Sequence, residues 1–530
     1  MDTIESSLRT LKANRQKWIY FALSISISAL VLLPTLWYAF GPDHGMCAYA
    51  AWIWRRFGQL PYVNYFEGDF PGIFLIYYFI QAVLGESVTG FRAFDLIWQT
   101  ATAAFLYLIT ERAFRKPMAG LIASLLYAIF YLGLGFWNTG ERDGFLLLPC
   151  AAAFWLYFRR APGRAPAWQA ALAGLLFGFA FLVKPVAALP GLIFAGILLK
   201  FSRAKTLSLL TYVFFAGLPF LSFLAWYWRM GHLAKMIEVV FVFGSEVYAN
   251  TLLVSLPYFL QGIVLLKSFA VAPMIAVGLL LFPVFGRGLE PPVKSNAKIL
   301  FIFAAGFFMG YLVQGKYFVY QQTPATALLC VFAGAGFALA VDRFKLSRPA
   351  WSPAAALLVV ILSALVLLAK PEQRAFFGHA LRESPARGQE HFNFFRSCKT
   401  AARYLEAHTA QDQKVQVWGT DGLINYLSGR QCPTRFAQIF PLALIPDPET
   451  KERSPLQKEL GREFLDAIRK DPPEYFLVET ISHPGFGIES SKKILTDDYP
   501  EIWSFVRDKY EPEYAVPFFD GAIEFYRLKK

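Results

Sequence analysis

The stretch that decides the fold is residues 41–72, GPDHGMCAYAAWIWRRFGQLPYVNYFEGDFPG. Long apolar runs precede and follow it, and it holds three carboxylates, Asp43, Glu67 and Asp69, among many aromatic side chains. A carboxylate that contacts lipid is costly, whereas one in a polar site is tolerated, and such sites in membrane proteins commonly carry function. An ordinary solvated loop with interfacial aromatic residues has the same composition. The rest of the chain is needed to decide between these two interpretations.

Composition indicates a membrane protein. Of the 530 residues, 56% are hydrophobic and only 17% are charged, which is less charge than a soluble domain of this length carries. The formal net charge is +13. The Lys and Arg residues stand in short clusters between apolar runs, which is typical of cytoplasmic loops rather than of a nucleic-acid-binding surface. We therefore expect a polytopic membrane protein that binds no nucleic acid.

Apolar runs and basic clusters together predict about eleven transmembrane helices, because each span needs about 20 apolar residues. The first run is too long for a signal peptide and has no small-residue cleavage site, so we expect an uncleaved span with the N-terminus in the cytoplasm. The run at 70–85 is short. If it lay flat on the outer surface, every later basic cluster would fall inside, as the positive-inside rule prefers. The predicted spans are 18–40, 91–114, 119–137, 145–158, 168–183, 185–199, 207–228, 257–285, 300–313, 325–341 and 352–368.

Beyond residue 370 the composition changes, and charged, polar and Pro residues increase. KVQVWG (414–419), EYFLVE (474–479) and AIEFYRL (522–528) predict strands, and 456–469 has helical spacing. We expect a membrane domain at 1–370, with flat helices in an outer loop at 41–90, and an extracytoplasmic α/β domain at 371–530. Cys398 and Cys432 are the only cysteines of this second part, and either a disulfide or two free thiols fits the sequence.

This topology collects charged side chains on the outer membrane face, at the ends of several spans. Lysines there would hold a phosphate, and a carboxylate would take a proton from a hydroxyl. Simpler interpretations stay open: snorkelling lysines, a self-paired acidic loop, and a histidine that only begins a helix. Two E-x-D pairs without histidine are weak evidence for a metal site, so we expect no cofactor, with a divalent cation as the alternative. The candidate residues are Asp43, His44, Glu67, Asp69, Glu141, Arg142, Asp143, Lys184 and Lys316.

An ordered set of short motifs resembles the GT-C glycosyltransferases, in the branch of the lipid A aminoarabinose transferases and the protein O-mannosyltransferases. The resemblance covers about residues 15–345, and the C-terminal α/β domain is similar to one that some members carry. It depends on the order of the motifs rather than on any one of them. The matching stretches are DHGMCAYAA (43–51), GQLPYVNYFEGDFPG (58–72), GERDGF (140–145), GLLFGFAFLVKP (174–185) and GKYFVYQQTP (315–324).

The resemblance implies transfer of a sugar from a polyprenyl-phosphate carrier to an acceptor on the outer membrane face. The family's essential first-loop acid falls on Asp43, its second-loop acid on Asp143, and its two lysines on Lys184 and Lys316. The chain departs from the family in two places. His44 stands where many members have an acid, and Gly68 and Asp69 follow Glu67 where the aminoarabinose transferases have a lysine.

Our hypothesis from the sequence is an inverting glycosyltransferase of the GT-C fold in the bacterial inner membrane, with a periplasmic C-terminus. Asp43 and Asp143 are its expected catalytic residues, and Lys184, Lys316 and Arg142 bind the donor phosphate. The other four candidates bind substrate, and the acceptor is a lipid, a glycan or a protein. The alternative is a transporter or flippase for an anionic polyprenyl-linked lipid. Transporters often have paired halves and helices broken in mid-membrane, and neither is apparent in this sequence.

Overall fold

A computed structural model describes residues 2–159, 167–202, 204–249, 271–344, 358, 361–362, 365, 371–420, 422–445, 452–481 and 490–530. The chain forms two compact units, each built from several stretches of sequence. The first unit contains Met1–Leu36, Arg92–Ser222 and Ser255–Glu383, and the second contains Trp37–Phe91, Phe223–Val254 and Ser384–Lys530. The predicted boundary at residue 370 stays a prediction, because compact packing does not test whether 371–530 folds by itself.

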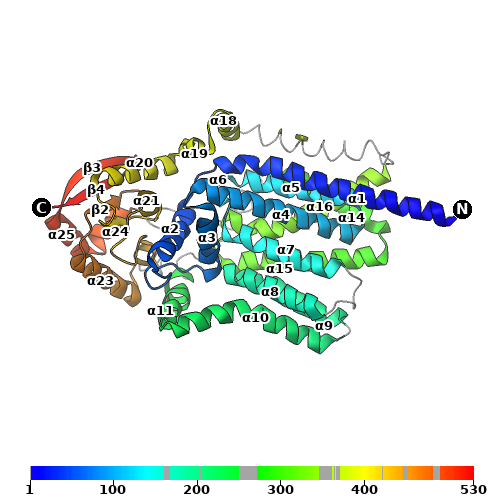
Figure 1. The fold of residues 1–530 in the computed structure, drawn as a ribbon, viewed down its shortest axis with the longest axis horizontal. Helices are drawn as coiled ribbons and strands as arrows, with labels where there is room; N and C mark the ends of the chain where they lie inside the picture. Colours follow the sequence, from blue (N-terminus) through cyan, green and yellow to red (C-terminus); the bar gives the residue numbers. More distant parts are fainter. Residues whose placement is uncertain are drawn as a thin grey trace. The chain divides into compact units, whose positions relative to one another are not determined.

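The first unit is a bundle of helices that run roughly parallel to one another (Figure 1). Short helical turns connect them: η1 (Leu33–Trp37), α6 (Gly135–Asn138), η2 (Pro185–Ala187), η5 (Gly286–Gly288) and η6 (Val319–Gln322), and α18 (Pro371–Ala380) follows near its end. The main helices are α1 (Asp2–Leu32), α4 (Val88–Phe114), α5 (Pro117–Gly133), α7 (Arg142–Phe158), α8 (Ala167–Val183), α9 (Ala188–Phe201), α10 (Lys205–Arg229), α14 (Ala272–Phe285), α15 (Pro291–Gln314) and α16 (Thr323–Arg343).

The bundle has the character of a multi-pass membrane protein. Five helical stretches of the described chain are long and apolar enough to cross a bilayer, and five shorter apolar helices accompany them. Along α10, large apolar side chains such as Leu210, Phe214 and Trp228 are exposed, as expected for a face that meets lipid. The predicted count of about eleven spans stays a prediction. Part of the eighth predicted span and nearly all of the eleventh lie outside the described residues.

Small residues let several of these helices approach closely. At Gly334 in α16, a Cβ atom would lie 2.5 Å from the Ala119 carbonyl oxygen in α5. At Gly174 in α8, it would lie 2.5 Å from the Tyr212 carbonyl oxygen in α10. Close backbone approach at small residues is the usual basis of helix packing in membranes, where lipid supplies no hydrophobic force between helices.

The second unit contains a mixed four-stranded sheet in the order β1-β2-β4-β3. β1 and β2 are parallel, with Val415 opposite Tyr475, and β4 is antiparallel to β2 and β3. The three predicted strands are β1, β2 and β4, and the predicted helix is α23 (Pro455–Lys470). The structure adds β3, which the sequence analysis missed. The strands are β1 (Val415–Trp418), β2 (Tyr475–Glu479), β3 (Tyr510–Phe518) and β4 (Gly521–Leu528).

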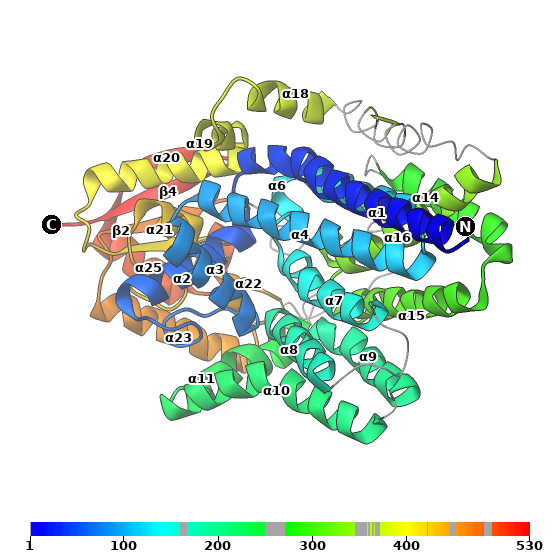
Figure 2. The same ribbon diagram turned by 45° about the vertical axis from the view of Figure 1, so that its right-hand side comes forward.

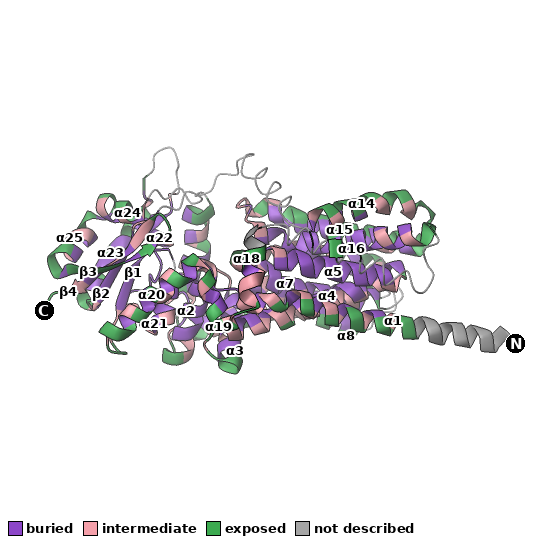
Figure 3. Ribbon diagram, turned by 90° about the horizontal axis from the view of Figure 1, so that it is seen from above, coloured by how far each residue is buried: buried purple, intermediate pink, exposed green. Residues whose placement is uncertain are grey.

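Helices cover both faces of this sheet. α20 (Asn393–His408) and α21 (Leu423–Ser428) lie on one face, and α23, α24 (Ser491–Asp497) and α25 (Pro500–Lys509) lie on the other (Figure 3). The side chains of successive β2 residues pack on opposite faces of the sheet. The ring of Tyr475 meets Tyr404 of α20 at 6.2 Å, and that of Phe476 meets Phe464 of α23 at 6.4 Å. β2 is buried throughout, as expected for a strand between two helix layers.

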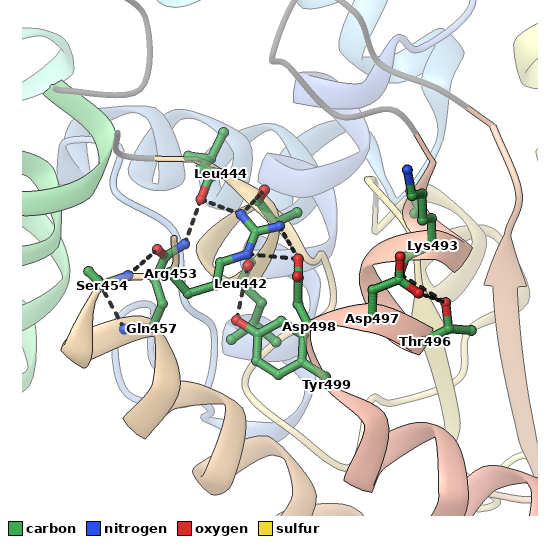
Figure 4. Close-up of polar contacts among 12 residues, drawn as sticks. Leu442, Leu444, Arg453, Ser454, Gln457, Lys493, Thr496, Asp497, Asp498 and Tyr499 are labelled. Carbon is green, nitrogen blue, oxygen red and sulfur yellow. Dashed lines mark hydrogen bonds and ion pairs between the residues drawn. The ribbon is translucent and has the colours of Figure 1, made fainter. Parts of the chain in front are cut away.

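A buried arginine secures the entry to α23. The guanidinium of Arg453 donates to the carbonyl oxygens of Ala443 (2.5 Å) and Leu444 (2.7 Å), and it pairs with Asp498 at 2.6 Å (Figure 4). Ser454 then caps the helix, because its hydroxyl accepts from the Gln457 N–H at 3.2 Å. These contacts satisfy backbone groups that the end of α22 (Phe440–Ala443) and the start of α23 leave unpaired.

Residues 41–90, the predicted first outer loop, belong to the second unit and pack on the α/β part (Figure 2). They contain α2 (Pro42–Phe57) and α3 (Pro71–Leu84). A Cβ atom at Gly45 of α2 would lie 2.6 Å from the Cβ of Leu423 in α21. α3 has 14 residues, so it extends about 21 Å, less than the roughly 30 Å of a hydrocarbon core. Helices α9 and α14, which lie in predicted spans, are equally short, so the flat placement of α3 stays a prediction.

The linking segment after α10 continues in the second unit as α11 (Leu233–Ile237) and two short π-helical stretches, η3 (Glu238–Val242) and η4 (Gly244–Tyr248). Cys398 and Cys432 are both free thiols in the structure. The thiol of Cys432 donates to the Gln416 side-chain oxygen at 3.0 Å. Of the two alternatives that the sequence left open, the structure therefore shows the unbridged one.

Candidate active site

An ion pair between two predicted site residues is the centre of the site in the first unit. Lys184 Nζ lies 2.5 Å from Asp143 Oδ2, and the two side chains are 16% and 1% exposed. Asp143 stands in the first turn of α7, where the helix dipole favours a negative charge. Lys184 is the extended link between α8 and η2, since Pro185 begins the next helical turn. Two helix ends therefore bring together residues that lie 41 positions apart.

Arg142 and Tyr320 extend this ion pair into a cluster. The Arg142 Nη2 donates to the Tyr320 hydroxyl at 3.0 Å, and its guanidinium carbon lies 5.7 Å from the centre of the Tyr320 ring. Lys184 Nζ lies 5.4 Å from the same ring centre, within range of a cation–π interaction. Glu141, which is buried, has a carboxylate oxygen 3.5 Å from Arg142. We call Glu141, Arg142, Asp143, Lys184 and Tyr320 the cationic cluster, after the two cationic side chains of Arg142 and Lys184.

Lys316 lies four residues before Tyr320, in the turn that joins α15 to η6. Gly315 and Tyr317 on either side of it have left-handed backbones, with φ of 65° and 55°, a conformation that is strained for a tyrosine. Burial lowers the pKa of the Lys316 amine to about 8, because a charged ammonium is disfavoured away from water. A lysine with such a pKa changes charge close to physiological pH.

The four candidates of the first outer loop lie in the second unit. Asp43 is half-buried in the first turn of α2. His44 is buried, its ring stacks on Phe40 at 5.6 Å, and its Nδ1 accepts from the Gly41 N–H at 3.1 Å. That bond caps the start of α2, so His44 has a structural contact, and its role in substrate binding stays a prediction.

Glu67 and Asp69 lie in a turn that residues of the α/β part hold. The side-chain amide of Gln438 donates to the Glu67 carboxylate. The Phe66 N–H donates to the Arg435 carbonyl oxygen at 2.7 Å, and the Tyr62 hydroxyl donates to the Asp69 carbonyl oxygen at 2.6 Å.

Tyr62 itself is fully buried and has a left-handed backbone with φ of 65°, and burial holds its pKa well above the usual range, so its hydroxyl stays a donor. Hydrogen bonds and burial therefore fix the backbone that carries Glu67 and Asp69.

Arg435 connects three segments of the second unit. It pairs with Glu238 at 2.6 Å and with Glu463 at 2.6 Å, and its guanidinium carbon lies 4.7 Å from the centre of the Phe66 ring. Desolvation raises the pKa of Glu238, but hydrogen bonds from Arg435 and Lys235 outweigh it, and the net pKa falls below the ordinary value. The carboxylate therefore stays ionised at neutral pH and keeps this junction intact.

Sequence reasoning missed Tyr320, Gln438 and Arg435, and also Arg92 and Asp95 in α4. The last two carried a signal, because two ionisable residues within a predicted span are unusual and commonly functional. Tyr320, Gln438 and Arg435 carried none, since a tyrosine in a loop and polar residues in an α/β domain are ordinary. Among the residues that the structure describes, no group of three or more His, Cys, Asp or Glu side chains is arranged to hold a metal ion.

Comparison with known proteins identifies the class of the fold. The model of the dolichyl-phosphate-mannose-protein mannosyltransferase family matches residues 70–228. ArnT from Cupriavidus metallidurans bound to undecaprenyl phosphate is similar with a TM-score of 0.58 and 13% identity, over 96% of this chain and 98% of that chain. Its apo structure gives 0.56 and 12%, over 96% and 97%.

The arabinofuranosyltransferase AftD from mycobacteria is similar with a TM-score of 0.53 and 14% identity, over 96% of this chain and 40% of that chain. At these identities the similarity concerns the fold, and the fold is that of the GT-C glycosyltransferases, as the ordered motifs predicted. No curated protein sequence is significantly similar to the chain.

Proposed function

We propose that this protein is a membrane glycosyltransferase that moves a sugar from a polyprenyl-phosphate carrier to the hydroxyl of a lipid, glycan or protein, with inversion at the anomeric carbon. We place it in the bacterial inner membrane, with the N-terminus in the cytoplasm and the C-terminus in the periplasm. The observation that carries the proposal is the cationic cluster, in which Lys184 and Arg142 gather around Tyr320 at helix ends. The protein shares its fold with ArnT, which has been crystallised with undecaprenyl phosphate.

On the donor side, the cluster suits a phosphodiester that becomes a phosphate monoester. Arg142 and Lys184 are balanced by Glu141 and Asp143 within the cluster, so Lys316 would supply the net positive charge. A phosphodiester carries one negative charge, and the leaving phosphate gains a second as the sugar departs. Cations that are already held in place stabilise this developing charge without reorganisation.

On the acceptor side, Asp43 is the proposed base. The acceptor oxygen forms a bond to the anomeric carbon while the bond from that carbon to the phosphate oxygen breaks. The hydroxyl proton goes to Asp43, and polyprenyl phosphate leaves with both electrons of the broken bond. Asp43 is half-buried in the first turn of α2, where the helix dipole favours a negative charge.

The remaining candidate residues have orienting or binding roles in this proposal. Asp143 orients Lys184 and borders the donor phosphate, and Glu67, Asp69, Glu141 and His44 contact sugar or acceptor hydroxyls. We propose no metal requirement, because paired carboxylates without a third ligand are a poor set for a divalent cation. Turnover should therefore persist in excess chelator. Loss of turnover with chelator and recovery with Mg²⁺ or Mn²⁺ would instead make the acidic pairs the ligands.

The decisive experiment offers purified protein in detergent a panel of polyprenyl-phosphate sugars together with lipid, glycan and peptide acceptors. Micelles have no two sides, so transport cannot be scored, but transfer still can. We expect one donor to give a glycosylated product that mass spectrometry identifies, and the yield to fall strongly in Asp143→Asn. A protein that moves labelled lipid across liposomes, but makes no product with any donor, would be a transporter.

A further inference from the structure

Two buried charges of the first unit have no part in the chemistry proposed above. Arg92 and Asp95 lie in α4, both side chains are 0% exposed, and Arg92 Nη1 is 3.9 Å from Asp95 Oδ2. A buried ion pair adds little net stability over well-packed apolar residues, because both charges lose their hydration. Ionisable residues inside a membrane bundle are therefore expected to serve a function.

Arg92 binds the backbone that leads into residues 141–143, which we call the acidic turn. Its Nη1 donates to the Thr139 carbonyl oxygen at 3.0 Å and to the Thr139 hydroxyl at 3.1 Å. Its Nη2 donates to the Phe136 carbonyl oxygen at 3.0 Å. Thr139 is two residues before Glu141, so one guanidinium fixes the chain immediately ahead of the cationic cluster.

Asp95 reaches the same turn through Tyr131. Its Oδ1 accepts from the Tyr131 hydroxyl at 2.8 Å and from the Gln99 amide at 3.0 Å. The Tyr131 oxygen in turn accepts from the Gly140 N–H at 2.6 Å. On the far side of the turn, a Cβ atom at Gly144 would lie 3.3 Å from Gln99 Nε2 and 3.4 Å from the Tyr131 oxygen.

The network therefore contacts the chain on both sides of residues 141–143. It bonds to residues 139 and 140 before them, and it packs against residue 144 after them. Directional hydrogen bonds before these three residues and close packing after them fix their backbone position, and Asp143 then pairs with Lys184. Apolar side chains would pack the same helices without setting this position.

We propose that Arg92, Asp95 and Tyr131 are positioning residues that set the place of Asp143 and, through it, of the Lys184 ammonium. The identity of the ligand that Lys184 binds rests on the proposed function. The placement of Lys184 does not, since it follows from the hydrogen bonds alone.

Tyr131→Phe is the test, because it removes one hydroxyl and leaves the ring. Arg92→Ala would leave Asp95 as an uncompensated buried charge, so a loss of folding there would decide nothing. The matched control is Tyr107→Phe. Tyr107 is also fully buried in the first unit, and its hydroxyl donates to the Lys17 carbonyl oxygen at 2.7 Å, so the control loses a comparable bond elsewhere.

The first readout is the reactivity of Lys184 toward an amine-selective acylating reagent, followed by mass spectrometry without any substrate. In the wild type, the amine is engaged in the ion pair with Asp143, which protects it from the reagent. We expect Tyr131→Phe and Asp143→Asn to label several-fold faster at Lys184, with Tyr107→Phe unchanged. Equal labelling of Tyr131→Phe and wild type would overturn the proposal.

The second readout is the split between kcat and KM in the transfer assay. Misplacing a binding group by a fraction of an ångström has large effects, so we expect Tyr131→Phe to raise the donor KM roughly tenfold. The acceptor KM should not change. If the variant only melts at a lower temperature, with wild-type donor KM and Lys184 labelling, the network is merely structural. If no donor supports transfer at all, the proposed function fails, and the labelling experiment still decides the positioning.

Discussion

At the scale of single residues, Lys184 and Lys316 are held differently, and each difference has a measurable consequence. Lys184 pairs with a buried carboxylate, whereas burial lowers the pKa of Lys316 to about 8. The first lysine thus has a fixed acidic partner, and the second has a charge that depends on pH. Both are expected to meet the donor phosphate.

Removal of the Lys184 charge should affect stability and donor binding separately. Lys184→Met leaves Asp143 without its cation, which costs about 3 kcal/mol for a buried pair. The double variant Lys184→Met/Asp143→Asn removes both charges, so its melting temperature should recover. Its donor KM should stay at least tenfold above that of the wild type. A double variant with wild-type donor KM would leave Lys184 only a structural role, and Lys298→Met, an exposed change in α15, is the control.

Lys316 should make kcat/KM for the donor fall at alkaline pH. Its amine has a pKa of about 8 in the free protein, so the fraction that is charged falls as the pH rises through 8. We expect kcat/KM for the donor to decline above this pH, by up to tenfold per pH unit. Lys316→Arg keeps its charge to far higher pH and should extend the plateau. A decline at pH 8 that persists in Lys316→Met would belong to another group.

Much of the cationic cluster was predictable from the sequence, and its geometry was not. Charged residues at the ends of apolar runs indicated Asp143 and Lys184 because a bilayer excludes charge from the spans themselves. Their pairing depends on how α7 and α8 pack, which the spacing of residues along the chain does not encode. Tyr320 was missed for the same reason, since only the folded structure places its ring beside the cations of Arg142 and Lys184.

At the scale of elements, tight helix contacts make some glycines irreplaceable. A Cβ atom at Gly334 would lie 2.5 Å from the Ala119 carbonyl oxygen, whereas one at Gly196 of α9 meets nothing within 4 Å. Alanine is favoured over glycine in a helix by roughly 0.5–1 kcal/mol. We therefore expect Gly334→Ala to lower the melting temperature in detergent and Gly196→Ala to hold or raise it. Equal melting of the two variants would contradict the close packing of α5 and α16.

Elements were predicted best where one physical signal dominates. β1 and β2 are short apolar runs buried between helices, and their composition alone marks them as strands. β3 escaped because Pro512 and Pro517 interrupt it and most of its residues are exposed. Proline is tolerated on an edge strand, and β3 forms one of the two edges of the sheet. An edge position is a property of the assembled sheet and not of the strand.

At the scale of the whole molecule, the sequence analysis did not predict which segments of the chain form the second unit. The first outer loop packs with residues hundreds of positions later, as in the bond from Arg435 to the Tyr62 carbonyl oxygen across 373 residues. The contrast between an apolar and a polar half predicted a boundary near residue 370. Such contrasts locate the membrane, but they do not reveal which loop a later domain binds.

The topology is testable in intact cells. In a variant without native cysteines, a single cysteine at position 87, which is exposed, should react with an impermeant thiol reagent added outside. Cysteines at 116 and 287 should react only after the membrane is opened, since the positive-inside rule places these basic loops in the cytoplasm. Outside labelling at position 116 would mean that α3 spans the membrane and would overturn this orientation.

The most direct test of the account is the stoichiometry of the reaction in detergent, measured for wild type and Asp43→Asn. Asparagine is nearly the same size as aspartate but cannot take the proton of the acceptor. The wild type should release one polyprenyl phosphate for each sugar that appears on the acceptor. Asp43→Asn should fold normally and turn over roughly 100-fold more slowly or worse, with Asp466→Asn, an exposed change on α23, as the control. Full turnover in Asp43→Asn, or release of the carrier without a glycosylated acceptor, would contradict the account.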